Sequence, residues 1–120
     1  MNVKEKQIFD NAVVCGNAEL CGDAEVYDYA KVSGSAKVYG NARVRNYAEV
    51  GDYAKVSGDA VVYGNAGVFG NAVVNGYAKV RGNARVGGTA VILGGTWDGS
   101  EGDILEGAWI APGVPLPARE

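Results

Sequence analysis

Residues 39–50 read YGNARVRNYAEV, which is two copies of a six-residue unit that recurs along most of the chain. Ala stands at every sixth position from Ala12 to Ala90, and an aliphatic residue follows two places later each time, from Val14 to Ile92. Two places after the aliphatic residue comes Gly, Asn or Asp, the residues that best tolerate a left-handed backbone. An unbroken repeat of this kind predicts a solenoid of stacked turns.

Within each unit, Ala-x-Val is expected to form a short strand whose Ala and Val point inward and whose middle residue points outward. The next residue points outward as well, and the pair that contains Gly turns the corner. A helix is excluded, because a period of six matches neither ~3.6 nor ~3.5 residues and the recurring Gly would break it. One such strand buries almost nothing, so stability must come from stacking many of them.

Three units that close a triangular coil would give a turn of 18 residues, and the outward positions test this length independently. One column of residues spaced 18 apart consists of Phe9, Tyr27, Arg45, Tyr63 and Arg81. Aromatic and guanidinium groups would then alternate at the ~4.8 Å spacing of neighbouring strands, as cation–π partners should. A second column places Glu25 next to Arg43. These columns favour three units per coil over two or four.

The phase of the repeat continues beyond the regular region. At the C-terminal end Ile104 and Ile110 keep the aliphatic phase and Ala108 keeps the Ala phase, whereas Asp98 falls where an aliphatic residue belongs. At the other end Ile8 is in phase. Counted from residue 5 to residue 112, the pattern predicts about six coils with one defective unit.

These boundaries divide the chain into three segments. Residues 1–10 are expected to form an N-terminal cap or first strand, and residues 11–94 the regular β-helix. Residues 95–120 are expected to form an irregular last coil and a Pro-rich tail that leaves the array, since proline cannot continue a strand ladder.

The repeat resembles that of the hexapeptide-repeat superfamily, in which an aliphatic residue recurs every six residues with a small residue two places before it. Residues 39–44 and 63–66 look most like the non-catalytic arrays common in bacterial and phage genomes, and residues 94–98 resemble the segment that often closes them. The resemblance implies an all-β, left-handed parallel β-helix with triangular coils and a C-terminal cap or tail. The handedness comes from the resemblance, and a right-handed β-helix of the bactofilin kind is the alternative.

The known enzymes of this superfamily are acyltransferases with a catalytic His and γ-class carbonic anhydrases with His zinc ligands, in sites that depend on loops between coils. This chain contains no His, and no insertion interrupts residues 11–94. We therefore expect no catalytic residue, no metal and no cofactor, with an acyltransferase-like enzyme as a remote alternative. Cys15 and Cys21 fall on neighbouring faces, so they are expected to be free thiols rather than a pair of metal ligands.

Most of the 11 Lys and Arg residues occupy outward positions. One face would combine a set of basic and aromatic residues, namely Tyr27, Arg43, Arg45, Tyr63, Lys79 and Arg81. Such a face suits an anionic small molecule or glycan, through stacking and charge-assisted hydrogen bonds. The alternative is a solvated wall whose side-chain ladders stabilise the stacking and block edge aggregation.

Apolar residues at outward positions gather in the second half of the repeat. Val73 shares a column with Val91, Leu93 lies beside them, and Trp97 and Trp109 follow nearby. Because contiguous apolar surface usually marks an interface, we expect these residues to form a homo-oligomer contact. A trimer is expected because the superfamily favours trimers. The alternative is that the tail folds over this strip as a cap.

The composition and charge narrow the remaining possibilities. A net charge of −3 gives no general attraction to nucleic acid or to a membrane surface. The first ten residues lack the apolar stretch of a signal peptide, and no window approaches the roughly 18 apolar residues of a membrane span. The sequence predicts a cytoplasmic protein, or a virion-associated one if a phage encodes it. Its expected role is that of a non-enzymatic structural module that oligomerises or docks onto a protein partner.

Overall fold

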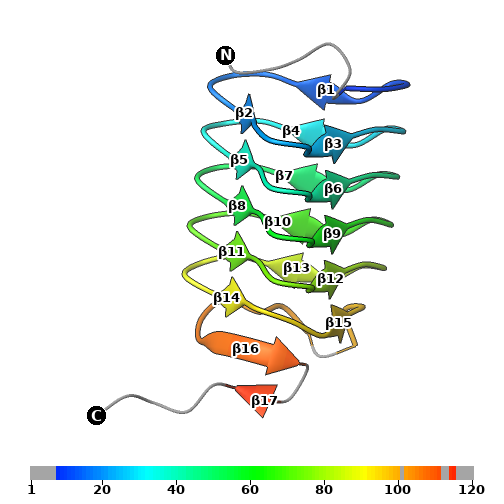
Figure 1. The fold of residues 1–120 in the computed structure, drawn as a ribbon. Coiled ribbons are helices and arrows are strands. Elements are labelled where there is room, and N and C mark those ends of the chain that lie inside the picture. The colour runs from blue at the N-terminus through cyan, green and yellow to red at the C-terminus, as the bar shows by residue number, and fades with distance from the viewer. Residues whose placement is uncertain (1–7, 101, 112–113, 116–120) are drawn as a thin grey trace.

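The computed structural model describes residues 8–100, 102–111 and 114–115. The chain is an all-β parallel solenoid of about five turns, with coils of about 18 residues stacked along one axis (Figure 1). The predicted coil length is confirmed, whereas the expected six coils become about five. Among the described residues there is no helix, and hence none that is long and apolar enough to cross a membrane. The first seven residues of the expected N-terminal segment and residues 116–120 of the tail lie outside the described parts.

Three sheets form the sides of the solenoid, parallel throughout except where β17 pairs antiparallel with β16, and each is named here after its first strand. The β1 sheet contains β1 (Val13–Val14), β4 (Lys31–Val32), β7 (Glu49–Val50), β10 (Gly67–Val68) and β13 (Arg85–Val86). The β2 sheet contains β2 (Glu19–Leu20), β5 (Lys37–Val38), β8 (Lys55–Val56), β11 (Val73–Val74), β14 (Val91–Ile92), β16 (Ala108–Ala111) and β17 (Val114–Pro115). The β3 sheet contains β3 (Glu25–Val26), β6 (Arg43–Val44), β9 (Val61–Val62), β12 (Lys79–Val80) and β15 (Thr96–Trp97).

The core is a narrow column made almost entirely of Ala and Val. Strand partners are 18 residues apart along the regular region, as in the pairing of Val26 with Val44 and of Val44 with Val62. Every Ala and aliphatic residue at the inward positions from Ala18 to Ile92 is at most 3% exposed. The residues between them point outward, as the alternation of side chains along a strand requires. The predicted division into inward and outward positions is therefore confirmed.

The corners depend on a left-handed residue in each unit. Gly40 has a φ of +68°, and Asn46 occupies the equivalent corner position of the next unit with a φ of +60°. Where Asn or Asp replaces Gly, the side chain bonds to the neighbouring coil. A carboxylate oxygen of Asp28 accepts hydrogen bonds from the backbone N–H and the side-chain amide of Asn46, both at 3.1 Å. Asn46 Oδ1 in turn accepts the N–H of Gly64 at 3.2 Å.

The phase of the repeat changes after Ile92. The next inward positions belong to Trp97, Ile104 and Trp109, at spacings of 5, 7 and 5 residues. Trp97 pairs with Val80, and Trp109 pairs with Ile92. Ile104 keeps its predicted phase.

Three expectations for this end of the chain are consequently wrong. Asp98 does not occupy an inward position but is exposed. Ile110 is not part of the core and is 44% exposed. Ala108 pairs with the outward-facing Val91, so it does not belong to the column of inward Ala residues.

The physical reason for the change is the chemistry of residues 97 and 98. An inward Asp98 would bury an ionised carboxylate in an apolar core with no partner, which carries a large desolvation cost. Because the unit that follows Ile92 has five residues instead of six, Trp97 points inward in place of Asp98 and is 2% exposed. Its ring meets that of Trp109 edge to face, with centroids 5.9 Å apart. Such edge-to-face contacts add to the stabilisation that burial of the two rings provides.

The two Trp residues are held in the same way. Trp97 Nε1 donates to the carbonyl of Gly94 and Trp109 Nε1 to that of Glu106, both at 2.9 Å. A Gly of positive φ stands two places before each ring, at Gly95 and Gly107. The sequence signal for this arrangement is the repeated Gly-x-Trp at residues 95–97 and 107–109, which the search for the six-residue period did not use.

The corrected phase predicts unequal costs of substitution at this end. Trp97→Ala should lower the free energy of unfolding by about 3–5 kcal/mol, because it removes a large buried side chain. Ile110→Ala should change it by less than about 1 kcal/mol, because that side chain is half exposed. Chemical denaturation of both variants measures the difference. Equal losses would contradict the assignment of Trp97 to the core.

Candidate functional site

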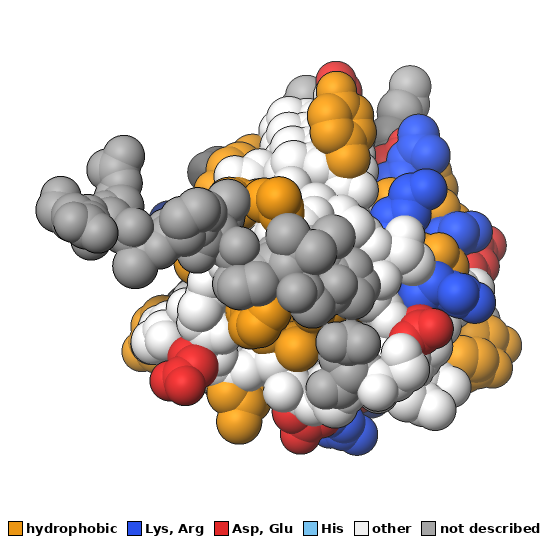
Figure 2. Space-filling view, turned by 90° about the horizontal axis from the view of Figure 1, so that it is seen from below, with side chains coloured by type: hydrophobic (Ala, Val, Ile, Leu, Met, Phe, Trp, Pro, Cys, Tyr) orange, Lys and Arg blue, Asp and Glu red, His pale blue; other side chains and the backbone are white. Residues whose placement is uncertain are grey.

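The six residues proposed from the sequence to bind a ligand share the outward face of the β3 sheet. Arg43 and Lys79 belong to the column of middle strand residues. The other four follow the strands of this sheet: Tyr27, Arg45, Tyr63 and Arg81. We call these six residues the basic wall. In the view along the solenoid axis, Lys and Arg side chains gather along one side of the molecule (Figure 2).

The centre of the basic wall is a sandwich of one ring between two guanidinium groups. Arg45 Cζ lies 4.6 Å from the centroid of the Tyr63 ring, and Arg81 Cζ lies 5.9 Å from it. The two Arg residues belong to the coils before and after Tyr63, so they approach the ring from its two sides. The alternation of rings and cations predicted from the 18-residue spacing is confirmed here. Because the two guanidinium groups cover the faces of the Tyr63 ring, a ligand can reach the N–H edge of each guanidinium but not a face of the ring.

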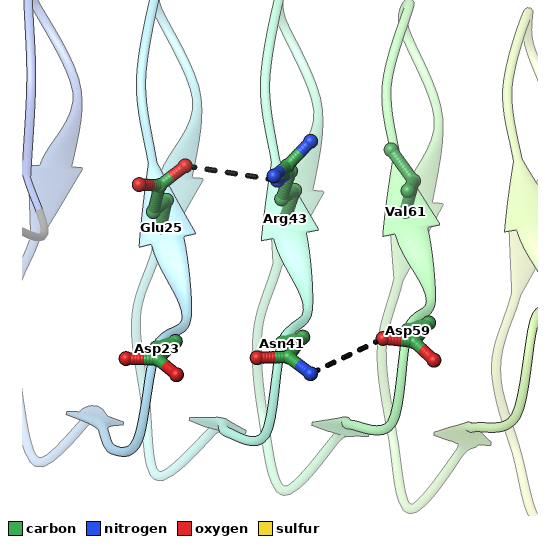
Figure 3. A pocket seen from close by; sticks show the side chains of 6 residues that line it. All are labelled: Asp23, Glu25, Asn41, Arg43, Asp59 and Val61. Carbon is green, nitrogen blue, oxygen red and sulfur yellow. Dashed lines mark hydrogen bonds and ion pairs between the residues drawn. The ribbon is translucent and has the colours of Figure 1, made fainter.

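Arg43 lies in a more acidic setting. It forms an ion pair with Glu25, with Nε and Oε1 3.7 Å apart, as predicted from their column. Both residues line an open groove of about 540 Å³, together with Asp23, Asn41, Asp59 and Val61 (Figure 3). Asn41 Nδ2 donates to Asp59 Oδ1 at 3.3 Å along one side of this groove (Figure 3). Three carboxylates against one guanidinium make this groove a poor site for an anion.

Asp98 follows Arg81 in the same column, because the shifted phase places it after β15. The backbone N–H of Ser100 donates to Asp98 Oδ1 at 3.0 Å. This bond, together with the Ser100 hydroxyl and the charge of Arg81, holds the pKa of Asp98 below its ordinary value. The basic wall therefore ends in a carboxylate whose pKa is lowered.

The apolar strip proposed for oligomerisation lies on the β2 sheet, but its membership differs from the prediction. Val73 pairs with Val91, as expected, and Leu93 lies beside them, all three half-buried. Trp97 is inside the core, and Trp109 points inward at the end of the solenoid and is half-buried.

The same change of phase adds two outward residues to this surface. Ala108 extends the column of Val73 and Val91, and Ile110 extends that of Leu93. We call these five residues the apolar strip: Val73, Val91, Leu93, Ala108 and Ile110. The predicted strip lacked Ala108 and Ile110, because the six-residue phase places both inside.

A second apolar feature, on the β1 sheet, is formed by Phe69, which is half-buried, and Leu105, which is 58% exposed. The ring of Phe69 lies over Gly67, where a Cβ atom would collide with it, and a Cβ atom at Gly51 would touch it at 3.6 Å. Leu105 covers Gly87 in a similar way, at 3.5 Å. These side chains replace the missing side chains of the glycines, as aromatic residues do for glycines in other sheets. In the apolar strip, Ile110 is 44% exposed and the other four residues are half-buried.

The cysteines and acidic residues show no arrangement that suggests metal binding. Cys15 is exposed, Cys21 is half-buried, and both are free thiols. Among the described residues, no group of three or more His, Cys, Asp or Glu side chains lies close enough together to hold a metal ion.

The fold and these surfaces define a parallel β-solenoid with open grooves beside its corners. Comparison of the chain with protein-family models, with curated proteins and with solved structures finds no match. The arguments for function therefore rest on the residues themselves.

The sandwich around Tyr63 predicts a measurable coupling. In a double-mutant cycle, Arg45→Ala and Tyr63→Leu should be coupled by about 0.5–1 kcal/mol in the free energy of unfolding, the range of an exposed cation–π contact. Arg85→Ala is the matched control, because Arg85 lies on the β1 sheet and should combine additively with Tyr63→Leu. If Arg85 and Tyr63 showed the same coupling energy as Arg45 and Tyr63, the contact between Arg45 and the Tyr63 ring would contribute nothing specific to stability.

The lowered pKa of Asp98 predicts a loss of stability in acid. Since the folded-state pKa lies below the unfolded value, ionised Asp98 stabilises the fold above the unfolded pKa of about 3.9, and this contribution is lost as the pH falls through the folded pKa. Asp98→Asn should make the melting temperature less sensitive to pH in that range. Ser100→Ala should raise the pKa of Asp98 only in part, because the backbone N–H remains. Identical acid profiles for the wild type and Asp98→Asn would contradict this account.

Proposed function

We propose that the protein is a non-catalytic assembly module, a rigid prism of the left-handed hexapeptide-repeat type that associates with copies of itself through the apolar strip. The observation that carries the proposal is the continuity of this strip over three successive strands of the β2 sheet, β11, β14 and β16. The expected stoichiometry is a trimer, as the resemblance to the hexapeptide-repeat superfamily implies.

A second copy of the chain suits this surface better than an unrelated partner. On the outward face of the β2 sheet, Val73 at the end of the apolar strip pairs with Lys55 of the preceding coil. The proposed contact therefore has a charged residue at one edge. Another copy supplies a strip of the same length and the same apolar character, and it can match the strip without burying Lys55. Apolar surface that lies next to charges in this way is typical of the core and rim of an interface.

The segment after β17 is the other possible occupant. β17 pairs antiparallel with β16 at the end of the β2 sheet, and five residues of the chain follow it. A variant that ends at Pro115 separates the two possibilities. It should associate as the full chain does if the strip binds another copy, whereas stronger association of the shortened chain would indicate that the tail covers the strip.

The non-catalytic part of the proposal rests on the repeat itself. Residues 11–94 carry no inserted loop, and the chain has no His. The known enzymes of the hexapeptide-repeat superfamily, which this repeat resembles, depend on His. The grooves beside the corners are open rather than enclosed and are built from short side-chain columns. Assays of acetyl-coenzyme A turnover and of bicarbonate dehydration should give no activity above background, and activity in either would overturn this part.

Charge introduced into the apolar strip should dissociate the assembly. Val91→Asp places a carboxylate between Val73 and Ala108 and should raise the dissociation constant about 100-fold, because the charge is buried without a partner on association. Native mass spectrometry and light scattering at micromolar concentrations measure the change.

Val61→Asp is the matched control. Val61 is also a half-buried outward Val, but it lies on the β3 sheet between Arg43 and Lys79. This variant should keep the oligomeric state of the wild type. A wild-type protein that is monomeric at tens of micromolar, or a loss of association in both variants, would rule out the proposed contact.

A further inference from the structure

Two lysines are stacked directly on one another on the β2 sheet. Lys37 of β5 pairs in register with Lys55 of β8, and both side chains are exposed. The other charged residues that face each other in the described strand pairs have opposite signs: Glu19 with Lys37, Glu25 with Arg43, and Lys31 with Glu49. Like charges directly opposite each other on neighbouring strands are destabilising. The fold therefore holds together two charges that repel.

Within the described part of the chain, Lys55 faces no carboxylate in its strand pairs, and Lys37 faces one, that of Glu19. The ion pair described there is that of Arg43 with Glu25, on a different sheet. Glu19 lies next to Lys37 in its column but forms no ion pair with it. On the other side, Lys55 is followed by Val73. The lysine pair thus presents a net positive charge at one place on the surface.

The lysines line an open groove of about 510 Å³ that is rich in hydrogen-bond donors. Its other lining residues are Ser35, Tyr53, Asn71 and Val73. The hydroxyl groups of Ser35 and Tyr53 and the amide of Asn71 can each donate a hydrogen bond. These three residues belong to one corner column, so they stand in successive coils along one side of the groove.

The corresponding grooves on the other two sheets differ in one respect. The groove on the β3 sheet contains Asp23, Glu25 and Asp59 (Figure 3), and that on the β1 sheet contains Glu49. The groove beside Lys37 and Lys55 has no carboxylate in its lining. The groove on the β1 sheet also holds two cations, Lys31 and Arg85, but against the carboxylate of Glu49, so the groove beside Lys37 and Lys55 has the most positive lining of the three.

We propose that this groove binds a tetrahedral oxyanion of the phosphate type, as inorganic phosphate or as a phosphate monoester. Neighbouring strands lie about 4.8 Å apart, so the two ammonium groups can each donate to a different oxygen of one phosphate through bonds of about 2.8 Å. The bound anion relieves the repulsion between the lysines, and the corner hydroxyls and amide donate to its remaining oxygens. Because the groove is open to solvent, binding weakens as salt screens the charges.

The test is a titration of the protein with inorganic phosphate, followed by NMR of the backbone amides at constant ionic strength with chloride as the reference anion. Saturable shifts are expected for residues 35–37 and 53–55. Lys37→Gln and Lys55→Gln should each weaken the apparent affinity about tenfold, which corresponds to the loss of one charge-assisted hydrogen bond of about 1.4 kcal/mol. Lys31→Gln is the matched control, because Lys31 is an exposed strand lysine on the β1 sheet that does not line this groove, and it should leave the affinity unchanged.

A parallel titration with phenyl phosphate distinguishes the two sources of the phosphate group. Tighter binding than inorganic phosphate, with additional shifts at Tyr53 and Val73, indicates a monoester whose organic part lies along the groove. Equal affinity of the two compounds indicates that the phosphate group alone is recognised. Both outcomes support the site.

Two results would overturn the proposal. One is a set of shifts that grow linearly without saturation, or that are the same in chloride. The other is an affinity that falls equally in Lys31→Gln and Lys55→Gln. The melting temperature of each variant without phosphate serves as the control for folding, and Lys55→Gln is expected to melt no lower than the wild type because it removes a repulsion. Val91→Asp should retain phosphate binding, so a failure of the assembly proposal can be told apart from a failure of this one.

Discussion

Every feature of this molecule depends on the backbone hydrogen bonds between coils. The N–H of Glu25 donates to the carbonyl of Ala42, and that of Tyr27 to Val44, both at 3.0 Å; the same pattern repeats through the regular coils. Such bonds form only where stacked coils adopt the same conformation at each position. The left-handed corner residue must therefore recur at the same phase, which restricts it to Gly, Asn and Asp. The six-residue sequence period is the consequence of this requirement.

The same register fills the interior of the regular coils with small side chains. Columns of Ala and Val stack at the spacing of neighbouring strands, so a larger or polar inward residue in the middle would have to displace its counterparts in the coils on both sides. The constraint is relaxed at the end of the array, where Trp97 and Trp109 replace the small residues. Elsewhere the charged and aromatic side chains lie on the outside, where pairs such as Glu25 with Arg43 and Arg45 with Tyr63 are 18 positions apart.

This geometry explains how much the sequence could predict. Pairs such as Glu25 with Arg43 and Arg45 with Tyr63 followed from counting 18 residues, because the regular coils have one length. The arrangement of the C-terminal end could not be predicted by this count, because the sequence there allows two phases of the repeat. One phase buries Asp98 and Ile110, and the other buries Trp97 and Trp109. The six-residue period cannot decide between them. The desolvation of a carboxylate and the larger apolar area of Trp decide it.

Because lateral contacts are local to a column, one face of a solenoid can change its character within a single coil. On the β2 sheet the step from Lys55 to Val73 separates a cationic groove from an apolar strip. In a globular domain such a boundary would involve residues from many segments, whereas here a substitution on one side of it leaves the coils on the other side in register. The two surfaces can therefore serve different partners on the same face. Val73, which lines the groove and belongs to the strip, is the residue at which the two surfaces meet.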